Sequence, residues 1–502
     1  MENVLTYAQF GAKGDGVTDD FVAIQKTHEE ANRTGAKVLG DEGATYLIRE
    51  VASPAIIRTD VDWRGAHFII DNRHIHPDSP ERWAWIFELA HDRPDAALLI
   101  PEGHSLTKGQ ANVGIAPGAP SILYLKDDND RIYSRWGENA NGGVPRQEVI
   151  LTDAEGNVDP KTPIQYDYKG LTSITAYASD DRPITVENGE FLTVICDPRE
   201  IDPSYTNHYC YHNRGIHLMR SNVVMRNVNH DEVGEHETVG VPYNAFYRFD
   251  LCANVELRDC LTYGQREYSF MDINKHTGAQ TRNAMGSYEI NMSACIDVRF
   301  IHLTQREDPA TGAVITNRQR YHGTMGSNFC RDLLMEDCYV DRFDSHQGAY
   351  NATVRRSTIG FSVLIIGAGT LLIEDCTFIR GYGAPSVVHL RGDYNSIFDG
   401  DVIVRNCVME PTMNTLVDGW WRSFYGGLPN RMINTLTVDG LTVKGESFTL
   451  FNYPGLTKAA LTDAVNPVYL PTKVTVRGVN KPVRLCPEEQ AEAFADTVFD
   501  IE

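Results

Sequence analysis

The sequence predicts a solenoid of parallel β-strands, in which short coils of chain stack on one another. The main observation is a repeated phrase, a β-branched run followed by Asp or Asn and then Cys. The four clear copies end at Asp259-Cys260, Asp337-Cys338, Asp375-Cys376 and Asn406-Cys407. Weaker copies begin at Ser221 and Asn434. A repeated unit of this kind buries its apolar face only on its neighbours, so the copies predict one continuous array.

Strand pairing within the array is predicted to be parallel. From Thr185 to about Phe451 the strand-like runs are short and bounded by turns, and two-residue hairpin turns are missing between copies. Antiparallel neighbours are usually joined by such turns, whereas parallel neighbours need a longer connection. A length of 502 residues would otherwise suggest several domains, but a repeat array can grow as a single body.

The ten cysteines are not expected to form a disulfide framework. Those of the four clear copies occupy one place in the repeat, and equivalent places in stacked coils point in the same direction. We therefore expect Cys260, Cys338, Cys376 and Cys407 to form an internal column of thiols packed as small apolar side chains.

Composition excludes two kinds of partner. The net charge of −22 argues against nucleic acid, whose phosphates need a basic surface, and no run of 18 or more apolar residues predicts a membrane span. The first residues carry no basic region, apolar core or cleavage site. This favours a cytoplasmic location, although a secreted protein whose leader had been removed would begin in the same way.

The N-terminal stretch from Leu5 to Gln25 predicts a short strand, a glycine-rich turn and a helix over about Phe21 to Arg33. Asp19 or Asp20 can cap this helix. The stretch lacks the Lys-Ser/Thr ending of a phosphate-binding loop, so that function is rejected. The phrase FGAKGDGVTDD followed by AIQ resembles the N-terminal signature of the pectate-lyase-like superfamily.

This resemblance implies an all-β fold, a right-handed parallel β-helix with an N-terminal capping helix. The superfamily includes polygalacturonases, pectate lyases, alginate epimerases and phage tailspikes, so it implies a saccharide partner without fixing one reaction. A homo-oligomer, a trimer, is a further expectation from the fold. Gly, Pro, Asp and Asn cluster between residues 92 and 181, which predicts a β-rich insertion of hairpins.

We predict four regions. They are a cap with the first coils at 1–91, the insertion at 92–181, the main β-helix with its groove at 182–486, and a C-terminal capping helix at 487–502. Aromatic residues of the insertion are expected either to line one wall of a sugar cleft or to fill the insertion's own core. They are Tyr124, Tyr133, Trp136, Tyr166 and Tyr168.

Histidine stands shortly before glycine in four polar stretches, which we interpret as equivalent loops of neighbouring coils. The four histidines are His276, His322, His346 and His389. Stacked at about 5 Å per adjacent strand, such side chains would line an elongated groove suited to a glycan. Because His and Gly are both common in turns, chance alignment is the alternative.

The polar loop Asp344–Gly348 is the predicted chemical site. Asp344 and His346 share one face of an extended chain, so the carboxylate can orient the imidazole and raise its basicity. The sequence Asp344-Ser345-His346 resembles the Asp-Pro-His motif of mannuronan epimerases and related alginate-active β-helices. Because Gln347 replaces the usual acid, no cofactor is expected, and calcium remains only an alternative.

Two reactions are compatible with these residues. In β-elimination of a uronate, His346 or Lys275 would act as base and Tyr321 as acid, while Arg320 and Arg391 would hold the carboxylate. The predicted substrate-binding residues are His276, His322, Arg391, Asp272 and Asp393.

An inverting hydrolase would instead pair Asp344 with Asp272 or Asp393. A third hypothesis is a non-enzymatic glycan-binding protein of the tailspike kind. We favour a polysaccharide-cleaving enzyme acting by elimination.

Overall fold

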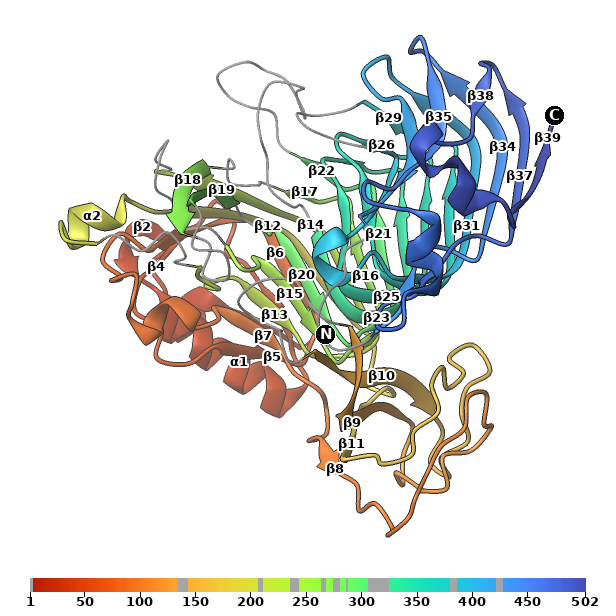
Figure 1. The fold of residues 1–502 in the computed structure, drawn as a ribbon. Helices are drawn as coiled ribbons and strands as arrows, with labels where there is room; N and C mark the ends of the chain where they lie inside the picture. Colours follow the sequence, from red (N-terminus) through yellow and green to blue (C-terminus); the bar gives the residue numbers. More distant parts are fainter. Residues whose placement is uncertain are drawn as a thin grey trace.

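The computed structural model describes residues 3–133, 143–205, 211–234, 243–262, 268–273, 280–285, 288–305, 325–379, 386–420 and 428–502. In these ranges the chain winds into a right-handed parallel β-helix whose coils stack along one axis (Figure 1). The predicted fold class is confirmed. Three ladders of parallel strands form its sides, and several long strands each contribute to two of them.

The first ladder carries the residues discussed below as a site. Its strands are β5 (Ala55–Ile57), β7 (Phe87–Leu89), β13 (Ile216–Leu218), β15 (Tyr247–Asp250), β20 (Ile290–Ser293), the first part of β23 (Met325–Glu336), the first part of β25 (Phe343–Arg355), β27 (Val363–Ile365), β30 (Val388–Leu390), β32 (Thr415–Asp418), β35 (Phe448–Asn452) and β38 (Val483–Arg484).

The second ladder runs the whole length of the solenoid. Its strands are β1 (Val4–Thr6), β3 (Lys37–Leu39), β6 (Val61–Asp71), β12 (Ile184–Val194), β14 (Val223–Val233), β16 (Ala253–Arg258), β21 (Ile296–Ile301), the later parts of β23 and β25, β28 (Gly367–Glu374), β31 (Phe398–Met409), β34 (Thr435–Val443), β37 (Lys473–Val479) and β39 (Val498–Ile501).

The third ladder is built from shorter pieces. Its separate strands are β2 (Asp15–Asp19), β4 (Thr45–Ile48), β17 (Leu261–Thr262), β22 (Thr304–Gln305), β24 (Tyr339–Val340), β26 (Thr358–Ile359) and β29 (Thr377–Phe378). Two small sheets lie outside the ladders. They are the hairpin β18 (Tyr268–Ile273) with β19 (Gln280–Met285), and the pair β33 (Asn430–Arg431) with β36 (Val468–Tyr469).

Inward side chains of equivalent register stack on one another through the middle of the solenoid. One such stack on the second ladder consists of Val255, Val298, Leu333, Ala352, Leu371, Val402, Leu436 and Val474. All are almost completely buried. Burial of one such side chain contributes about 1.5–3 kcal/mol, so stacking of β-branched and leucine side chains is the main force that holds neighbouring coils together.

The repeated Asp/Asn-Cys phrase forms one corner of each coil. The residue before each of the four cysteines has a left-handed backbone, with φ of 53° at Asp259, 54° at Asp337, 54° at Asp375 and 48° at Asn406. Asp and Asn tolerate this conformation better than other residues with a side chain. The cysteine that follows then points inward, and all four predicted cysteines are buried and free.

The N-terminal helix α1 (Phe21–Thr34) covers the first coils, as predicted (Figure 1). Its apolar face contains Phe21, Ile24 and Ala31. Buried His28 makes a 2.9 Å hydrogen bond with the Tyr7 hydroxyl, and burial lowers the pKa of His28 to about 3. The Asp20 carboxylate accepts from the backbone N–H groups of residues 13 and 14, so it fixes the glycine-rich turn and does not cap the helix by a side-chain bond.

The insertion forms an antiparallel sheet of β8 (Ala96–Ala97), β9 (Ser121–Tyr133), β10 (Val144–Thr152) and β11 (Ser173–Ala178) that projects from the side of the solenoid (Figure 1). It has a core of its own around Leu123, Ile150 and Tyr168. At the far end of the solenoid the expected helix is a short 3₁₀ helix, η6 (Glu488–Phe494). The residues after it pair with β37 as strand β39 and so extend the second ladder.

The remaining helical turns are short. They are α2 (Pro198–Ile201) and the 3₁₀ helices η1 (Tyr7–Phe10), η2 (Pro80–Trp83), η3 (Gly392–Tyr394) and η5 (Lys458–Thr462).

The corner conformation can be tested at exposed Asp375. Replacing it with valine should cost about 1–2 kcal/mol of unfolding free energy, because a β-branched residue is strained at positive φ. Asp375→Gly, which removes the same carboxylate but tolerates the conformation, should cost much less. Urea unfolding of both variants measures the difference, and equal losses would contradict the proposed role of the corner.

Candidate functional site

One outward-facing position of the first ladder is polar in most coils, and we call this row the polar column. Inward neighbours such as Phe249 and Leu390 alternate with it along each strand. In register from β7 to β35 the column contains Glu88, His217, Arg248, Asn291, Gly326, Asp344, Leu364, His389, Asp418 and Asn452. Neighbouring positions lie about 4.8 Å apart, so the column extends along the solenoid axis as a glycan chain would.

Asp344 lies at the middle of the column and is fully buried between two arginines. Nη1 of Arg391 donates to both of its oxygens at 2.7 and 2.8 Å, and Nη2 of Arg342 lies 3.1 Å from Oδ2. Burial opposes ionisation, but the charges of Arg391 and Arg342 outweigh it and hold the pKa of Asp344 below its ordinary value. Asp344 is therefore an anion at neutral pH.

Arg391 is held on both of its edges. Its Nε and Nη2 each lie 3.1 Å from a carboxylate oxygen of Asp393, while Nη1 contacts Asp344. The structure thus brings together three predicted site residues, Asp344, Arg391 and Asp393. Their arrangement is an ion-pair network whose guanidinium is already bound by two protein carboxylates.

The predicted polar loop around His346 is part of a strand. β25 runs without interruption from Phe343 to Arg355, and its register with β23 shifts by one residue so that His346 is the extra residue of a bulge. Bulges turn a side chain away from the regular alternation and are common beside active sites. The His346 ring lies 5.5 Å from the ring of Tyr394 and 6.2 Å from that of Tyr288.

A histidine–carboxylate pair that the sequence did not reveal lies further along the column. Nδ1 of His389 is 2.7 Å from Oδ1 of Asp418, which also accepts from the Ser386 hydroxyl at 2.6 Å. Such a contact fixes the ring and leaves Nε2 for chemistry. Asp418 ends the strand-like run Thr415–Asp418, but its partner can be recognised only once the strand register is known.

The expected alignment of the histidines is only partly tested. His389 is in register with Leu364 and so with Asp344, whereas His346 stands two residues further along its strand. His346 and His389 therefore occupy different positions of coils that lie two steps apart, because the repeat follows strand register and not the distance to the next glycine. His276, His322, Lys275, Arg320 and Tyr321 lie outside the described residues, and of Asp272 only its backbone in β18 is described.

A second charged cluster lies at the N-terminal end of the column. His217 contacts Asp250 at 3.0 Å and Glu88 at 3.3 Å, and its ring stacks on Trp85 at 4.9 Å. Burial opposes the charge on His217, but the hydrogen bonds to Asp250 and Glu88 outweigh it and raise the pKa. The carboxylate of Asp250 is also paired with Arg248.

The insertion packs beside the column. Tyr133 and Val144 at the ends of β9 and β10 form one apolar cluster with Tyr394 and two isoleucines of the solenoid. Tyr124 packs against the solenoid in another cluster, whereas Tyr166 and Tyr168 belong to the insertion's own core. The predicted aromatic residues are therefore divided between the interface and the core. Trp136 lies outside the described residues.

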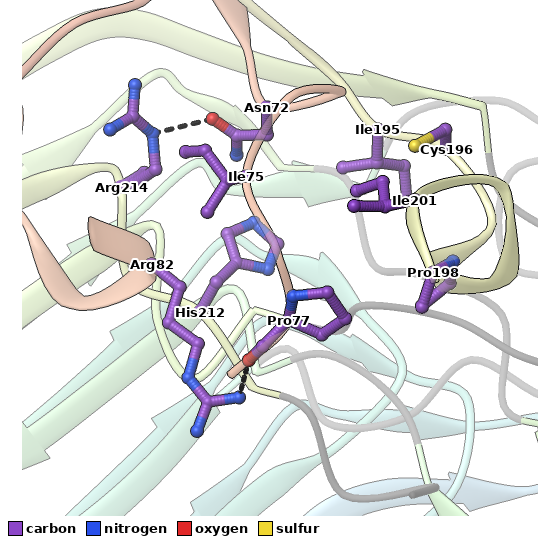
Figure 2. A pocket seen from close by; sticks show the side chains of 10 residues that line it. All are labelled: Asn72, Ile75, Pro77, Arg82, Ile195, Cys196, Pro198, Ile201, His212 and Arg214. Carbon is purple, nitrogen blue, oxygen red and sulfur yellow. Dashed lines mark hydrogen bonds between the residues drawn. The ribbon is translucent and has the colours of Figure 1, made fainter. Parts of the chain in front are cut away.

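A pocket near the first coils is too small for a saccharide. Its volume is about 20 Å³, enough for little more than a water molecule. Figure 2 shows isoleucine and proline side chains around it, with Arg214 bonded to Asn72 and Arg82 bonded to the carbonyl of Pro77. In the part of the chain that the structure describes, no group of three or more His, Cys, Asp or Glu is arranged to hold a metal ion. No helix there is long and apolar enough to cross a membrane.

Fold and register define the class of the chain as a right-handed parallel β-helix, which is the fold that the resemblance seen in the sequence implies. Among solved structures it is similar to the tailspike protein gp49 of Pseudomonas phage LKA1, with a TM-score of 0.57 and 13% identity over 96% of this chain and 82% of that one. The tailspike gp61 of Pseudomonas phage phi297 gives a TM-score of 0.50 and 13% identity over 99% and 84%.

At this identity the likeness concerns the fold alone. No protein-family profile matches the sequence, and no curated protein matches it either.

The network around Asp344 predicts a large loss of stability when its carboxylate is removed. Asp344→Asn leaves Arg342 without its carboxylate partner and Arg391 with Asp393 alone, and should cost about 3–5 kcal/mol. Asp393→Asn is the matched control, since its side chain is 31% exposed, and should cost less than about 1 kcal/mol. Urea unfolding distinguishes the two, and similar small losses would show that Asp344 is not a structural anion.

The cluster around His217 predicts a pH-dependent contribution to stability. Because the folded state raises the pKa of His217, its stabilisation is complete below the unfolded value of about 6.5 and is lost as the pH rises through the folded value. The melting temperature of wild type should therefore exceed that of His217→Gln most at about pH 6 and least at about pH 9. A difference that grows with pH would contradict this assignment.

Proposed function

We propose that the protein binds a polysaccharide along the polar column and cleaves its glycosidic bonds. Support comes from the length of the column and from the aromatic rings beside it. Trp85 stacks on His217, Tyr288 lies beside His346, and Trp420, which is 41% exposed, lies 6.3 Å from His389. Aromatic faces pack well against the apolar faces of sugar rings, while the polar column offers partners for hydroxyl and carboxylate groups.

Elimination is the reaction we favour, and the pair His389–Asp418 is the observation that carries it. In this proposal Nε2 of His389 removes the C5 proton of a uronate, and Asp418 stabilises the imidazolium that forms. The electron pair forms the C4–C5 double bond, the bond from C4 to the glycosidic oxygen breaks, and that oxygen takes a proton from His346. Arg342, beside the column, would hold the uronate carboxylate: it has one contact with Asp344, whereas Arg391 is held by both Asp344 and Asp393.

Hydrolysis by paired carboxyl groups is the alternative. It needs one protonated carboxyl group at neutral pH, but the pKa values of Asp344 on the column and of Asp250 beside it are lowered. Burial raises the pKa of Glu148 to about 7, but this residue belongs to β10 of the insertion and lies buried next to Arg331. An inverting hydrolase would pair Asp344 as base with Asp393 or Asp272 as acid.

A binder without catalysis is the third candidate. The two similar structures reported above are both phage tailspikes, and a column of this kind can hold a glycan without cleaving it. The trimer, the cytoplasmic location and the absence of a calcium ion remain predictions. Size-exclusion chromatography with light scattering tests the first of them.

The proposed reaction is tested with uronate-containing polysaccharides. Elimination creates an unsaturated uronate that absorbs ultraviolet light, whereas hydrolysis creates reducing ends without this absorbance. His389→Ala should lower kcat by about 10²–10⁴-fold, the usual contribution of a positioned proton-transfer group. His346→Ala should lower kcat by a similar factor, with the melting temperature of each variant measured to exclude unfolding.

The control is His302→Ala. His302 also contacts a carboxylate, that of Asp259, but lies at an exposed corner of the solenoid, so this variant should retain full activity. Reducing ends without ultraviolet absorbance would favour the hydrolase. Binding without either product would favour the tailspike-like binder, and full activity of His389→Ala would overturn its role as base.

A further inference from the structure

A cleft of about 600 Å³ lies where the insertion meets the solenoid, at a corner separate from the polar column. A volume of this size is typical of ligand sites, which often form between packed units. Its insertion side is lined by Pro120, Leu151, Thr152, Asp153, Asn157, Val158, Asp159, Pro160 and Ser179. Its solenoid side is lined by Asn222, Ala253, Asn254 and Asp297.

The solenoid wall is a row of regularly spaced polar side chains. Asn222, Asn254 and Asp297 occupy the same corner of three successive coils, each with a left-handed backbone, at φ of 59°, 55° and 52°. Nδ2 of Asn254 donates to Oδ1 of Asn222 at 2.7 Å. This spacing of about 4.8 Å per coil is comparable with the length of one sugar unit in a chain.

The cleft offers mainly hydrogen-bond acceptors. Among the described residues, Oδ1 of Asn254 and Oδ2 of Asp159 accept no protein hydrogen bond, and the buried hydroxyl of Thr152 has no partner. Proline, leucine and valine side chains supply apolar surface between these groups. Hydroxyl groups that donate, mounted on a ring with apolar faces, complement such a wall.

The charge of the cleft selects between sugar classes. Asp153, Asp159 and Asp297 all line it, and no lysine or arginine does. Burial raises the pKa of neighbouring Asp332, and the charges of Asp297 and Asp159 add to the effect. A uronate or other anionic sugar would be repelled here.

We propose that this cleft is a second saccharide-binding site, which takes a neutral oligosaccharide and acts independently of cleavage at the polar column. The polar column, with its arginines and histidines, accepts an anionic stretch, whereas the cleft accepts neutral units. Together the two sites hold different parts of one heteropolysaccharide or two separate glycans.

Binding is measured by calorimetry with linear neutral hexasaccharides of glucose, galactose and mannose, on the full chain. At least one should bind wild type at millimolar concentration or below. Ser179→Trp, which fills the cleft, and Asn254→Gly, which removes an acceptor but keeps the left-handed backbone, should each weaken binding at least tenfold.

Asn227→Gly is the matched control. Asn227 also has a left-handed backbone, with φ of 50°, and donates to the asparagine of the preceding coil, Asn188, at 2.9 Å, but it does not line the cleft. This variant should bind as wild type does. His389→Ala should also bind normally, so that loss of cleavage and loss of the second site are told apart.

Three results would overturn the proposal. In the first, no neutral hexasaccharide binds to wild type. In the second, Ser179→Trp leaves the binding unchanged. In the third, EDTA abolishes the binding and calcium restores it, which would make the cleft a cation site. If the cleft bound a uronate hexasaccharide more tightly than the neutral ones, the inference that its aspartates repel anionic sugars would also be wrong.

Discussion

The left-handed residue at each corner of a coil is the constraint on which the structure depends. Three rows of such residues run along the solenoid, one through Asn254 and Asp297, one through Asp259, Asp337 and Asp375, and one through Leu251, Ala294 and Phe329. Each corner turns the chain at a fixed position, so every coil enters the next strand in the same phase. Because alternation along a strand has a period of two, a slip of one residue at a corner would turn the polar column inward.

This constraint explains why the fold could be predicted from the sequence. Asp or Asn before an inward Cys is a local signal, since both the tolerance of positive φ and the small size of the thiol belong to single residues. The structure also shows a second row of thiols that the phrase did not mark, with Cys252 and Cys295 at an Sγ–Sγ distance of 3.6 Å. These cysteines lie at a different corner of the coil. No Asp or Asn precedes them there, so the repeated Asp/Asn-Cys phrase does not mark them.

The site could be predicted only in part, because it depends on contacts between coils. Asp344, Arg391 and Asp393 were chosen from residue type and do lie together. The pair of His389 with Asp418 spans 29 residues, and the bulge at His346 arises from one additional residue in β25 relative to β23. Both depend on register, which no short stretch of sequence contains. A buried ion pair such as Asp344 with Arg391 adds little net stability, but it fixes the position of both side chains. The polar column therefore keeps one geometry.

The insertion links the two proposed saccharide sites, since it borders the polar column through Tyr133 and forms one side of the cleft through Asp159. Its attachment includes Arg331 of the solenoid, which is buried, lies 3.4 Å from Glu148 and donates to two backbone carbonyls of the insertion. Apolar packing alone would allow the insertion to slide along the corner row. Directed bonds from one guanidinium to three acceptors restrict it to one position, and the widths of both sites follow from that position.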